Sequence, residues 1–399
     1  MEKGEIAGDS RPLLTAVMPI YNGERHLRET LDHIVKIQAR DMELLLIDDG
    51  STDASGAICR EYEALDARIR YVRQENQGIA ASRNRGLALA GGEYVCFWDQ
   101  DDIVIPENYF SLLYKIRAKH ACMGICSTAR MIRGEMSVFE KLAEGISRGD
   151  EVKRSLLYPL LFRGYGYPFA GTQNYLYGSV WKCIFRTDFI RDHHIRFARF
   201  VNYEDDWIFV THALCCADQV VTCAAAGYCW RVNESSESHS GRYVPDLGDR
   251  FTVLDEYVSG YLEAGIQDEE VLSEYRKINL CEHYVELYRN AANMKGAHGE
   301  RKALRRKYHE HVKEYLRRTD YRSQLTVRKY LRSSAYRKRI ILSSLRYGGI
   351  EVTYIISGIY DRIESRLSQI RWVTRMERRH KMKQDQEASD ETDYSDTLL

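Results

Sequence analysis

The stretch Glu93-Tyr-Val-Cys-Phe-Trp-Asp-Gln-Asp-Asp102 decides the fold class of this 399-residue chain. Residues 94–98 form a short apolar run after a Gly-Gly pair, which is typical of a strand buried on both faces of a parallel sheet. The run ends at Asp99, and two more carboxylates follow at Asp101 and Asp102. Because open α/β sheets bind ligands at the carboxyl ends of their strands, these acidic side chains indicate a ligand site.

Three carboxylates within four residues repel one another unless a cation joins them. Oxygen ligands of this kind suit Mn²⁺ or Mg²⁺, and a divalent ion at this position would also hold a diphosphate. The alternative is an acidic loop that caps a helix starting near Pro106, because caps and loops are where single acidic residues usually lie. The stretch alone leaves both interpretations open.

Composition describes a globular protein with a large core. The chain is 44% hydrophobic and 29% charged, with a formal net charge of zero, and its length suits two or three domains. None of its ten cysteines lies in a Cys-x-x-Cys pair, which argues for buried free thiols rather than a zinc site or disulfides. Residues 1–11 lack an apolar signal region, and no stretch reaches the roughly 18 apolar residues of a membrane span, so we expect a cytoplasmic protein.

Apolar runs and amphipathic segments alternate through the first hundred residues. We expect strands at residues 13–20, 43–47, 69–72 and 94–98, separated by helices at residues 24–37, from a cap at 51–53 to about 65, and at 79–89. This alternation predicts βαβ units and a mostly parallel sheet flanked by helices. Tyr21, Asp49 and Asp99, which follow three of these strands, would then gather along one edge of the sheet.

Side chains near this edge suit a nucleotide. A carboxylate can accept the N–H of a uracil ring, an aromatic ring can stack on the base, and an Arg can balance phosphate charge. Asp49, Tyr21 and Arg83 offer these functions. Each alone has an ordinary explanation, since Asp49 also suits a turn and Arg83 a solvated helix face. Their combination with the acidic strand end favours a nucleotide site.

Four segments resemble, in order and spacing, the nucleotide-binding half of glycosyltransferase family 2. They are Val17-Met-Pro-Ile-Tyr-Asn-Gly-Glu24, Ile47-Asp-Asp-Gly-Ser-Thr-Asp53, Asn76-Gln-Gly-Ile-Ala-Ala-Ser-Arg-Asn-Arg-Gly86 and Gly92-Glu-Tyr-Val-Cys-Phe-Trp-Asp-Gln-Asp-Asp102. The resemblance implies a GT-A (Rossmann-like) fold and an inverting hexosyltransferase or N-acetylhexosaminyltransferase that depends on Mn²⁺ or Mg²⁺. Its donor would be a nucleotide-diphosphate sugar, with UDP expected, and its acceptor a glycan or lipid-linked molecule in cell-surface polysaccharide synthesis.

The resemblance also assigns roles by motif position. Six residues would bind the donor nucleotide. Pro19 and Tyr21 would line the base pocket, with Glu24 in the same segment, while Asp49 would bond uracil and Arg83 would lie near the diphosphate. Asp99 would face the ribose, and Asp101, the last residue of the Asp99-Gln100-Asp101 motif, would bind the metal. His239 lies in a polar loop where the family has a flexible segment and would supply a third metal ligand, although a single His in a Ser-rich loop also suits a solvated side chain.

An inverting transfer needs a base that takes the proton of the acceptor hydroxyl. In relatives this base is the Asp of a Glu-Asp motif at the start of a helix, and Asn202-Tyr-Glu-Asp-Asp-Trp-Ile-Phe209 offers two candidates. Aligning Phe209 favours Asp206, which we prefer, whereas reading Glu204 with its neighbour favours Asp205. Either carboxylate could instead cap the helix or favour its N-terminal dipole.

The acceptor side is less defined. Residues 178–188 resemble the stretch that flanks the acceptor site, and Trp181 there suits either stacking on a sugar or a core position. Residues 127–167 match no motif, and their Arg and Gly content predicts variable acceptor loops.

We expect four parts: an N-terminal extension (1–12), a GT-A catalytic domain (13–245), a helical domain (246–366) and a basic then acidic, disordered tail (367–399). Lys and Arg far outnumber Asp and Glu between residues 301 and 383, and residues 337–346 and 352–360 combine apolar faces with basic surroundings. Two interpretations stay open: peripheral contact with anionic lipid at the inner face of the plasma membrane, and a solvated helical bundle. No motif for nucleic-acid binding accompanies these basic residues, so nucleic acid is not an expected partner.

Two other functions compete with the transferase. A non-catalytic nucleotide-sugar-binding or scaffold protein of a polysaccharide assembly complex would lack the Asp-x-Asp motif or the base, and this chain has candidates for both. A sugar-nucleotide pyrophosphorylase would have a Gly-rich N-terminal loop with Arg and Lys, where this chain has Pro-Ile-Tyr-Asn-Gly-Glu at residues 19–24.

Overall fold

The computed structural model describes residues 11–162, 176–201, 204–232, 243–294 and 298–319. The chain divides into two compact units, residues 1–280 and residues 281–399. The predicted four-part division stays a prediction, because residues 1–10 and 320–399 lie outside the described ranges.

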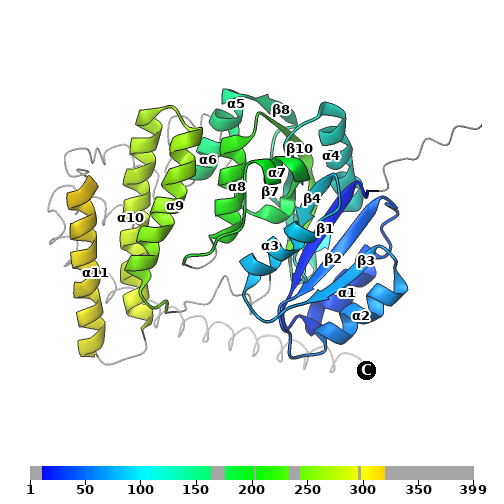
Figure 1. The fold of residues 1–399 in the computed structure, drawn as a ribbon, viewed down its shortest axis with the longest axis horizontal. Helices are drawn as coiled ribbons and strands as arrows, with labels where there is room; N and C mark the ends of the chain where they lie inside the picture. Colours follow the sequence, from blue (N-terminus) through cyan, green and yellow to red (C-terminus); the bar gives the residue numbers. More distant parts are fainter. Residues whose placement is uncertain (1–10, 163–175, 202–203, 233–242, 295–297, 320–399) are drawn as a thin grey trace, which may run out of the picture. The chain divides into compact units, whose positions relative to one another are not determined.

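The first unit is built on a ten-stranded sheet whose first half alternates strands with helices (Figure 1). These elements are β1 (Leu14–Ile20), α1 (Glu24–Ile34), β2 (Met42–Asp48), α2 (Ser55–Leu65), β3 (Ile69–Arg73), α3 (Ile79–Leu89) and β4 (Tyr94–Phe97). Strand β1 pairs in parallel with β2 on one side and β4 on the other, and β3 pairs in parallel with β2. The predicted α/β sheet flanked by helices is confirmed.

The second half of the sheet is mixed, so the expectation of a mostly parallel sheet holds for β1 to β4 but not for the later strands. Its elements are β5 (Ile103–Val104), α4 (Pro106–Lys119), β6 (Met123–Ile132), β7 (Glu135–Glu140), β8 (Gly145–Arg148), α5 (Asp150–Val152), η1 (Lys153–Leu157), α6 (Tyr158–Leu161), η2 (Val180–Lys182), β9 (Cys183–Arg186), α7 (Thr187–Asp192), α8 (Asp205–Cys216) and β10 (Gln219–Arg231). The strand order is β3-β2-β1-β4-β9-β6-β10-β5, with β7 on β6 and β8 on β10. Strand β9 runs antiparallel to β4 and β6, whereas β6 and β10 are parallel.

Part of the region expected to be acceptor loops is a β-hairpin. Strands β6 and β7 pair antiparallel across a turn at Arg133 and Gly134, which have φ angles of 53° and 85°. Positive φ at both positions is the geometry of a tight two-residue hairpin turn. The hairpin carries exposed apolar residues near its turn, including Ile132 and Met136. Residues 135–138 do alternate polar and apolar side chains, which is a strand signal that the expectation of loops overlooked.

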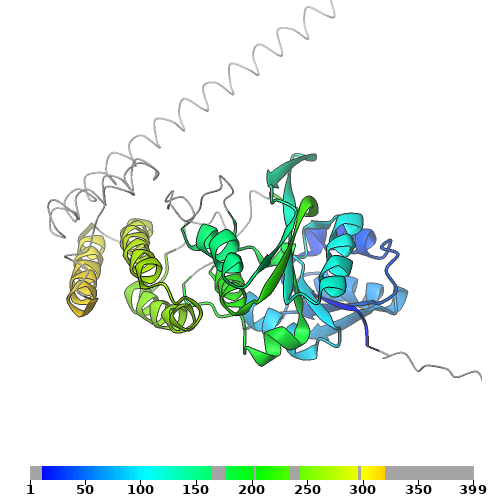
Figure 2. The same ribbon diagram turned by 90° about the horizontal axis from the view of Figure 1, so that it is seen from above.

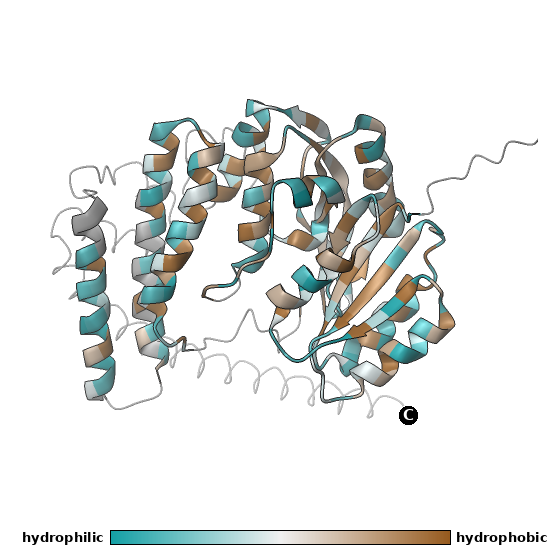
Figure 3. Ribbon diagram, viewed as in Figure 1, coloured by the Kyte–Doolittle hydropathy of each residue, from teal (hydrophilic) through white to brown (hydrophobic). Residues whose placement is uncertain are grey.

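The core lies between the sheet and the helices that cover both of its faces (Figure 2). All seven residues of β1 are buried, and apolar residues dominate the central strands (Figure 3). Gly86 brings α3 against β1, because a Cβ at this position would lie 2.1 Å from Cγ1 of Val17. Nine of the ten cysteines have described side chains; all nine are free thiols and, except for the partly exposed Cys216, are buried, as predicted.

Three long helices follow the sheet: α9 (Leu247–Gly265), α10 (Glu269–Asn293) and α11 (His298–Thr319). In α9 the buried residues Leu254, Val258 and Leu262 follow helical spacing. In the second unit, Asn290 donates a 2.8 Å hydrogen bond to the Tyr308 hydroxyl. No helix in the described ranges is both long and apolar enough to cross a membrane. The segments 337–346 and 352–360 lie outside these ranges.

Candidate active site

The ends of β1, β2 and β4 meet at one edge of the sheet, because the three strands are parallel neighbours. Gln100, between the two aspartates of the Asp-x-Asp motif, ties two of these ends together. Its Oε1 accepts a 3.0 Å hydrogen bond from the Tyr21 N–H, and its Nε2 donates a 3.1 Å bond to the Tyr21 carbonyl. Gly23 leaves room for this side chain, since a Cβ there would lie 2.2 Å from Gln100 Oε1.

Asp49, predicted to bind uracil, shapes the loop before α3. Its carboxylate accepts hydrogen bonds from Gln74 Nε2 (2.8 Å), Gln77 N–H (2.9 Å) and Gly78 N–H (2.7 Å). Gly78 has φ of 88°, a conformation that favours glycine. Asp49 thereby connects the end of β2 to the loop that begins the helix carrying Arg83.

The other predicted base-pocket residues have different surroundings. Pro19 is buried in β1, whereas Tyr21 is 50% exposed, which leaves its ring accessible. Glu24 joins two helix starts, because its carboxylate accepts a 2.9 Å bond from the Ala54 N–H while Asp53 accepts a 3.1 Å bond from the Glu24 N–H. This reciprocal pairing gives Glu24 a structural role at the N-termini of α1 and α2.

Arg83 joins the two acidic motifs of the chain. Its guanidinium donates to Asp205 at 2.7 Å, to Asp206 at 2.5 Å and to Asp99 at 3.0 Å. Burial opposes the charge of this side chain, which is 3% exposed, but the carboxylates of Asp206, Asp99 and Asp205 outweigh that effect and raise the pKa of Arg83. The predicted strand-end carboxylate and both predicted bases are thus brought to one guanidinium.

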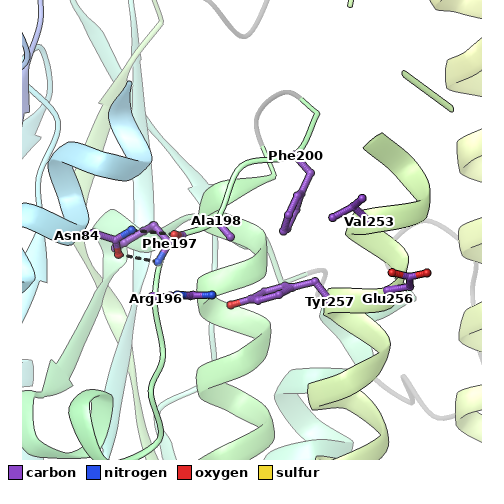
Figure 4. Close-up of a pocket in the computed structure, with 8 residues that line it drawn as sticks. All are labelled: Asn84, Arg196, Phe197, Ala198, Phe200, Val253, Glu256 and Tyr257. Atoms are coloured by element: carbon purple, nitrogen blue, oxygen red, sulfur yellow. Dashed lines mark hydrogen bonds between the residues drawn. The ribbon is translucent and has the colours of Figure 1, made fainter. Parts of the chain in front are cut away.

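Phe197, in the segment that precedes α8, packs against Arg83. The Arg83 guanidinium carbon lies 5.3 Å from the centroid of the Phe197 ring, within reach of a cation–π interaction. Asn84 fastens the Phe197 backbone with two hydrogen bonds, donating at 2.8 Å and accepting at 2.9 Å (Figure 4). Both residues line a cavity of about 590 Å³ to which α9 contributes Tyr257. Arg83 Nε has no hydrogen-bond partner within the described part of the chain.

The two candidate bases differ in exposure. Both lie in the first turn of α8, which begins at Asp205. The Asp205 side chain is 6% exposed, whereas that of Asp206 is 21% exposed. Burial raises the pKa of Asp206 to about 7, although Arg83 opposes the shift. The second Asp206 oxygen accepts a 3.1 Å hydrogen bond from the Val180 N–H, which orients the carboxylate.

The strand-end carboxylates are connected to β10. Asp99 N–H donates to the Tyr228 hydroxyl at 2.9 Å, and Asp102 accepts a 2.8 Å bond from the Arg231 N–H. Burial, with the nearby charges of Asp99 and Asp101, raises the pKa of Asp102 well above its ordinary value. A divalent cation would relieve this crowding, so the donors fit a hard, oxygen-preferring metal ion in their chemistry.

The described residues do not complete a metal site. No group of three or more His, Cys, Asp or Glu side chains among them is arranged to hold a metal ion. His239 lies outside the described residues, so its predicted part as a ligand stays a prediction.

Several contacts near this site could not be predicted from the sequence. Trp181 is 8% exposed and stacks on Tyr228 with ring centroids 4.6 Å apart, so it has the core position that was one of its two interpretations. No sequence pattern predicted the contact of Tyr228 with Asp99, because the two residues are 129 positions apart. Gln100 could have been recognised as a site residue, since it lies inside the Asp-x-Asp motif.

Comparison with known proteins relates part of the chain to a family. Residues 15–176 match the family model Glycosyl transferase family 2. Glycosyltransferase GlyA of Streptococcus pneumoniae is 46% identical over 102 residues, which are 26% of this chain and 14% of GlyA. The protein EpsH of Bacillus subtilis is 27% identical over 269 residues, 67% of this chain and 72% of EpsH.

The match to GlyA therefore spans well under two thirds of that relative. Among solved structures, S. aureus TarS 1–349 in complex with UDP-GlcNAc superposes with a TM-score of 0.61 at 19% identity, covering 88% of this chain and 91% of that one. This likeness extends the shared architecture beyond the family match. Residues 15–176 of the chain thus match glycosyltransferase family 2, and the chain has the GT-A fold that TarS shows.

Proposed function

We propose that this protein is a metal-dependent inverting glycosyltransferase that moves a hexose or N-acetylhexosamine from a UDP-sugar to a glycan or lipid-linked acceptor in cell-surface polysaccharide synthesis. The observation that carries the proposal is the Arg83 cluster, in which one buried guanidinium joins Asp99 to Asp205 and Asp206. An inverting transfer needs the leaving group and the base on opposite sides of one sugar carbon. The Arg83 guanidinium, shared by Asp99 and by Asp205 and Asp206, would hold these carboxylates at fixed positions relative to one another.

Asp206 is the proposed base. A general base works best when its pKa lies near the operating pH, and the pKa of Asp206 is raised to about 7. Its partial exposure leaves it open to an acceptor hydroxyl, whereas Asp205 is buried against Arg83. We assign Asp205 to positioning: it shares the Arg83 Nη1 nitrogen with Asp206 and limits the movement of both groups.

The donor would lie along the carboxyl edge of β1, β2 and β4. The exposed Tyr21 ring suits stacking on the base beside Pro19, and Asp49 suits the N–H of uracil in addition to its loop contacts. Glu24 would hold the loop that carries Tyr21, Asp99 would face the ribose, and Arg83 would contribute positive charge near the diphosphate. The likeness to TarS, whose structure was solved in complex with UDP-GlcNAc, supports a UDP-sugar donor.

Asp101 would hold Mn²⁺ or Mg²⁺, with His239 as a further ligand. When bound, such an ion supplies positive charge that stabilises the departing nucleotide diphosphate.

Peripheral contact with the inner face of the plasma membrane, also part of the proposal, rests on the basic composition of residues 301–383. The non-catalytic scaffold is less favoured, because a binding module has no need of a carboxylate whose pKa is raised to about 7 at the site.

Nucleotide release from a panel of UDP-, GDP- and TDP-sugars tests the proposal without knowledge of the acceptor. We expect release from one donor with Mn²⁺ or Mg²⁺, loss of release with EDTA, and loss in Asp101→Asn. Asp188→Asn, an exposed aspartate in the first turn of α7, is the matched control and should behave as the parent protein. Absence of both release and nucleotide binding for every donor would contradict the proposal and favour the scaffold.

A further inference from the structure

A second cluster lies beside the Asp-x-Asp motif and has no part in the chemistry described so far. The rings of Phe139, Tyr177 and Trp230 pack together, with centroid distances of 4.8 Å from Phe139 to Tyr177 and 5.9 Å from Phe139 to Trp230. All three residues remain partly exposed. Partly exposed aromatic rings suit the apolar face of a sugar, because they offer a large contact area with little loss of side-chain freedom.

The cluster lies on the catalytic side of the sheet. Successive side chains of a strand point to opposite faces, so Tyr228 and Trp230 share one face of β10 and Arg231 occupies the other. The Tyr228 hydroxyl accepts the Asp99 N–H, whereas Arg231 pairs with Glu29 of α1. Trp230 is therefore about 7 Å further along the same face than the residue that contacts the Asp-x-Asp motif.

A buried ion pair holds this cluster in place. The Lys182 ammonium donates to both oxygens of Glu140, at 2.7 Å and 2.6 Å, and both side chains are almost fully buried. Glu140 also accepts a 2.9 Å hydrogen bond from the Tyr177 N–H, and it follows Phe139 directly in β7. The pair thus fixes two of the three rings, while Lys182 ends the short helix η2 whose first residue, Val180, orients Asp206.

Arg130 adds a positive charge to the cluster. It is the strand partner of Trp230, and its guanidinium carbon lies 5.5 Å from the centroid of the Phe139 ring. Its Nε is buried without a hydrogen-bond partner, and its side chain makes no ion pair with the residues that the structure describes. A half-buried guanidinium without a counter-ion is unfavourable, and a negatively charged ligand group would satisfy it.

We propose that Arg130, Phe139, Tyr177 and Trp230 form an acceptor subsite for a negatively charged sugar, in which the rings contact the sugar and Arg130 binds its phosphate or carboxylate. The inference rests on the proposed transferase function. It narrows the class of acceptor to anionic saccharides. The sugar that presents its hydroxyl to Asp206 would be bound by residues of β6, β7 and β10.

Binding can be measured by ligand-observed NMR on the full chain with UDP present in saturating amount, so that the nucleotide site is filled. The probes are glucose 6-phosphate, glucuronate, glucose and inorganic phosphate. We expect at least one charged sugar to bind about tenfold more tightly than glucose and than phosphate alone, since a charge-assisted hydrogen bond contributes about that factor. A preference for glucose 6-phosphate or for glucuronate distinguishes a phosphate-bearing from a carboxylate-bearing acceptor.

Two variants assign the binding to the cluster. Arg130→Gln should weaken the charged sugar about tenfold and leave glucose unchanged, and Trp230→Leu should weaken both. Arg133→Gln, an exposed arginine at the turn of the same hairpin, is the matched control and should bind as the parent does. Circular dichroism shows whether each variant is folded. If Trp230→Leu does not fold, the comparison of Arg130→Gln with the parent is sufficient to test the proposal.

Three results would overturn the subsite: equal binding by the parent and Arg130→Gln, no preference for either charged sugar, or loss of binding when UDP is added, which would place the probe in the nucleotide site. A failure of the transferase proposal gives a different pattern. In that case no nucleotide-sugar is turned over, but charged sugars still bind in the presence of UDP and still depend on Arg130.

Discussion

The two halves of the sheet hold their polar side chains in different ways. Along β1, β2 and β4, carboxylates and amides bind backbone groups of neighbouring loops, as Asp49 does with the loop at Gln77 and Gln100 does with Tyr21. In the second half, charged side chains pair with each other across the core, as Lys182 does with Glu140. Arg83 is where the two halves meet.

The difference has an energetic consequence. Loss of a loop contact that water can reach, such as that of Gln100 with Tyr21, costs about the net value of a hydrogen bond, because water replaces the missing partner. Loss of one member of a buried ion pair leaves the other charge in the core without compensation, which costs about 3–5 kcal/mol. Substitutions in the first half should therefore alter donor binding, and those in the second half should first alter stability.

The largest effect is expected at the junction of the two halves. Arg83→Met leaves Asp99, Asp205 and Asp206 together without their shared cation, so we expect the free energy of unfolding to fall by about 3–5 kcal/mol and nucleotide release to be lost. Urea denaturation at pH 7.5 measures the first quantity. A change below about 1 kcal/mol would show that the carboxylates do not depend on Arg83.

The buried pair of the second half comes next. Lys182→Met should reduce the free energy of unfolding by about 3–5 kcal/mol, because Glu140 stays buried without its cation. The double variant Lys182→Met with Glu140→Leu should recover most of this loss, since apolar residues of similar size often replace a buried pair without cost. Equal losses in the single and double variants, measured by thermal and urea unfolding, would contradict this account.

A catalytic effect with little change in stability is expected at Asp206. Asp206→Asn should lower kcat by about 10²–10⁴-fold, the usual contribution of a positioned base, while the protein stays folded. In the parent, kcat should rise with pH and level off above about 7, because the pKa of Asp206 is raised to about 7 and only its carboxylate form can accept a proton. The residual activity of Asp206→Asn should lack this rise. Loss of the rise in Asp205→Asn but not in Asp206→Asn would transfer the role to Asp205.

The smallest effect is expected at the edge of the first half. Gln100→Ala removes two hydrogen bonds to the backbone of Tyr21, and we expect a loss of about 1 kcal/mol, seen as a roughly fivefold higher KM for the donor. The free energy of unfolding should change little, since water reaches both groups. Gln74→Ala, which removes a bond to the buried Asp49, should cost more than Gln100→Ala.

The first half of the fold was predictable because its signals are local. Each strand is a short apolar run with a polar residue at its end, and parallel pairing necessarily places those ends on one edge. The predicted positions of α3 and β1 agree with the structure almost residue for residue. Asp49, Asp99, Asp205 and Asp206 were likewise recognisable from motif and spacing, although their contacts were not.

What the sequence alone determined is therefore the βαβ half of the sheet and the identity of the acidic residues at its edge, since both follow from local pattern. Only the tertiary structure decided which charges meet. The partners Arg83 and Asp206 are 123 residues apart, and Lys182 and Glu140 are 42 apart. No local pattern specifies such pairs, because their proximity depends on the order of β4, β9, β6 and β10 in the sheet, which long-range packing selects.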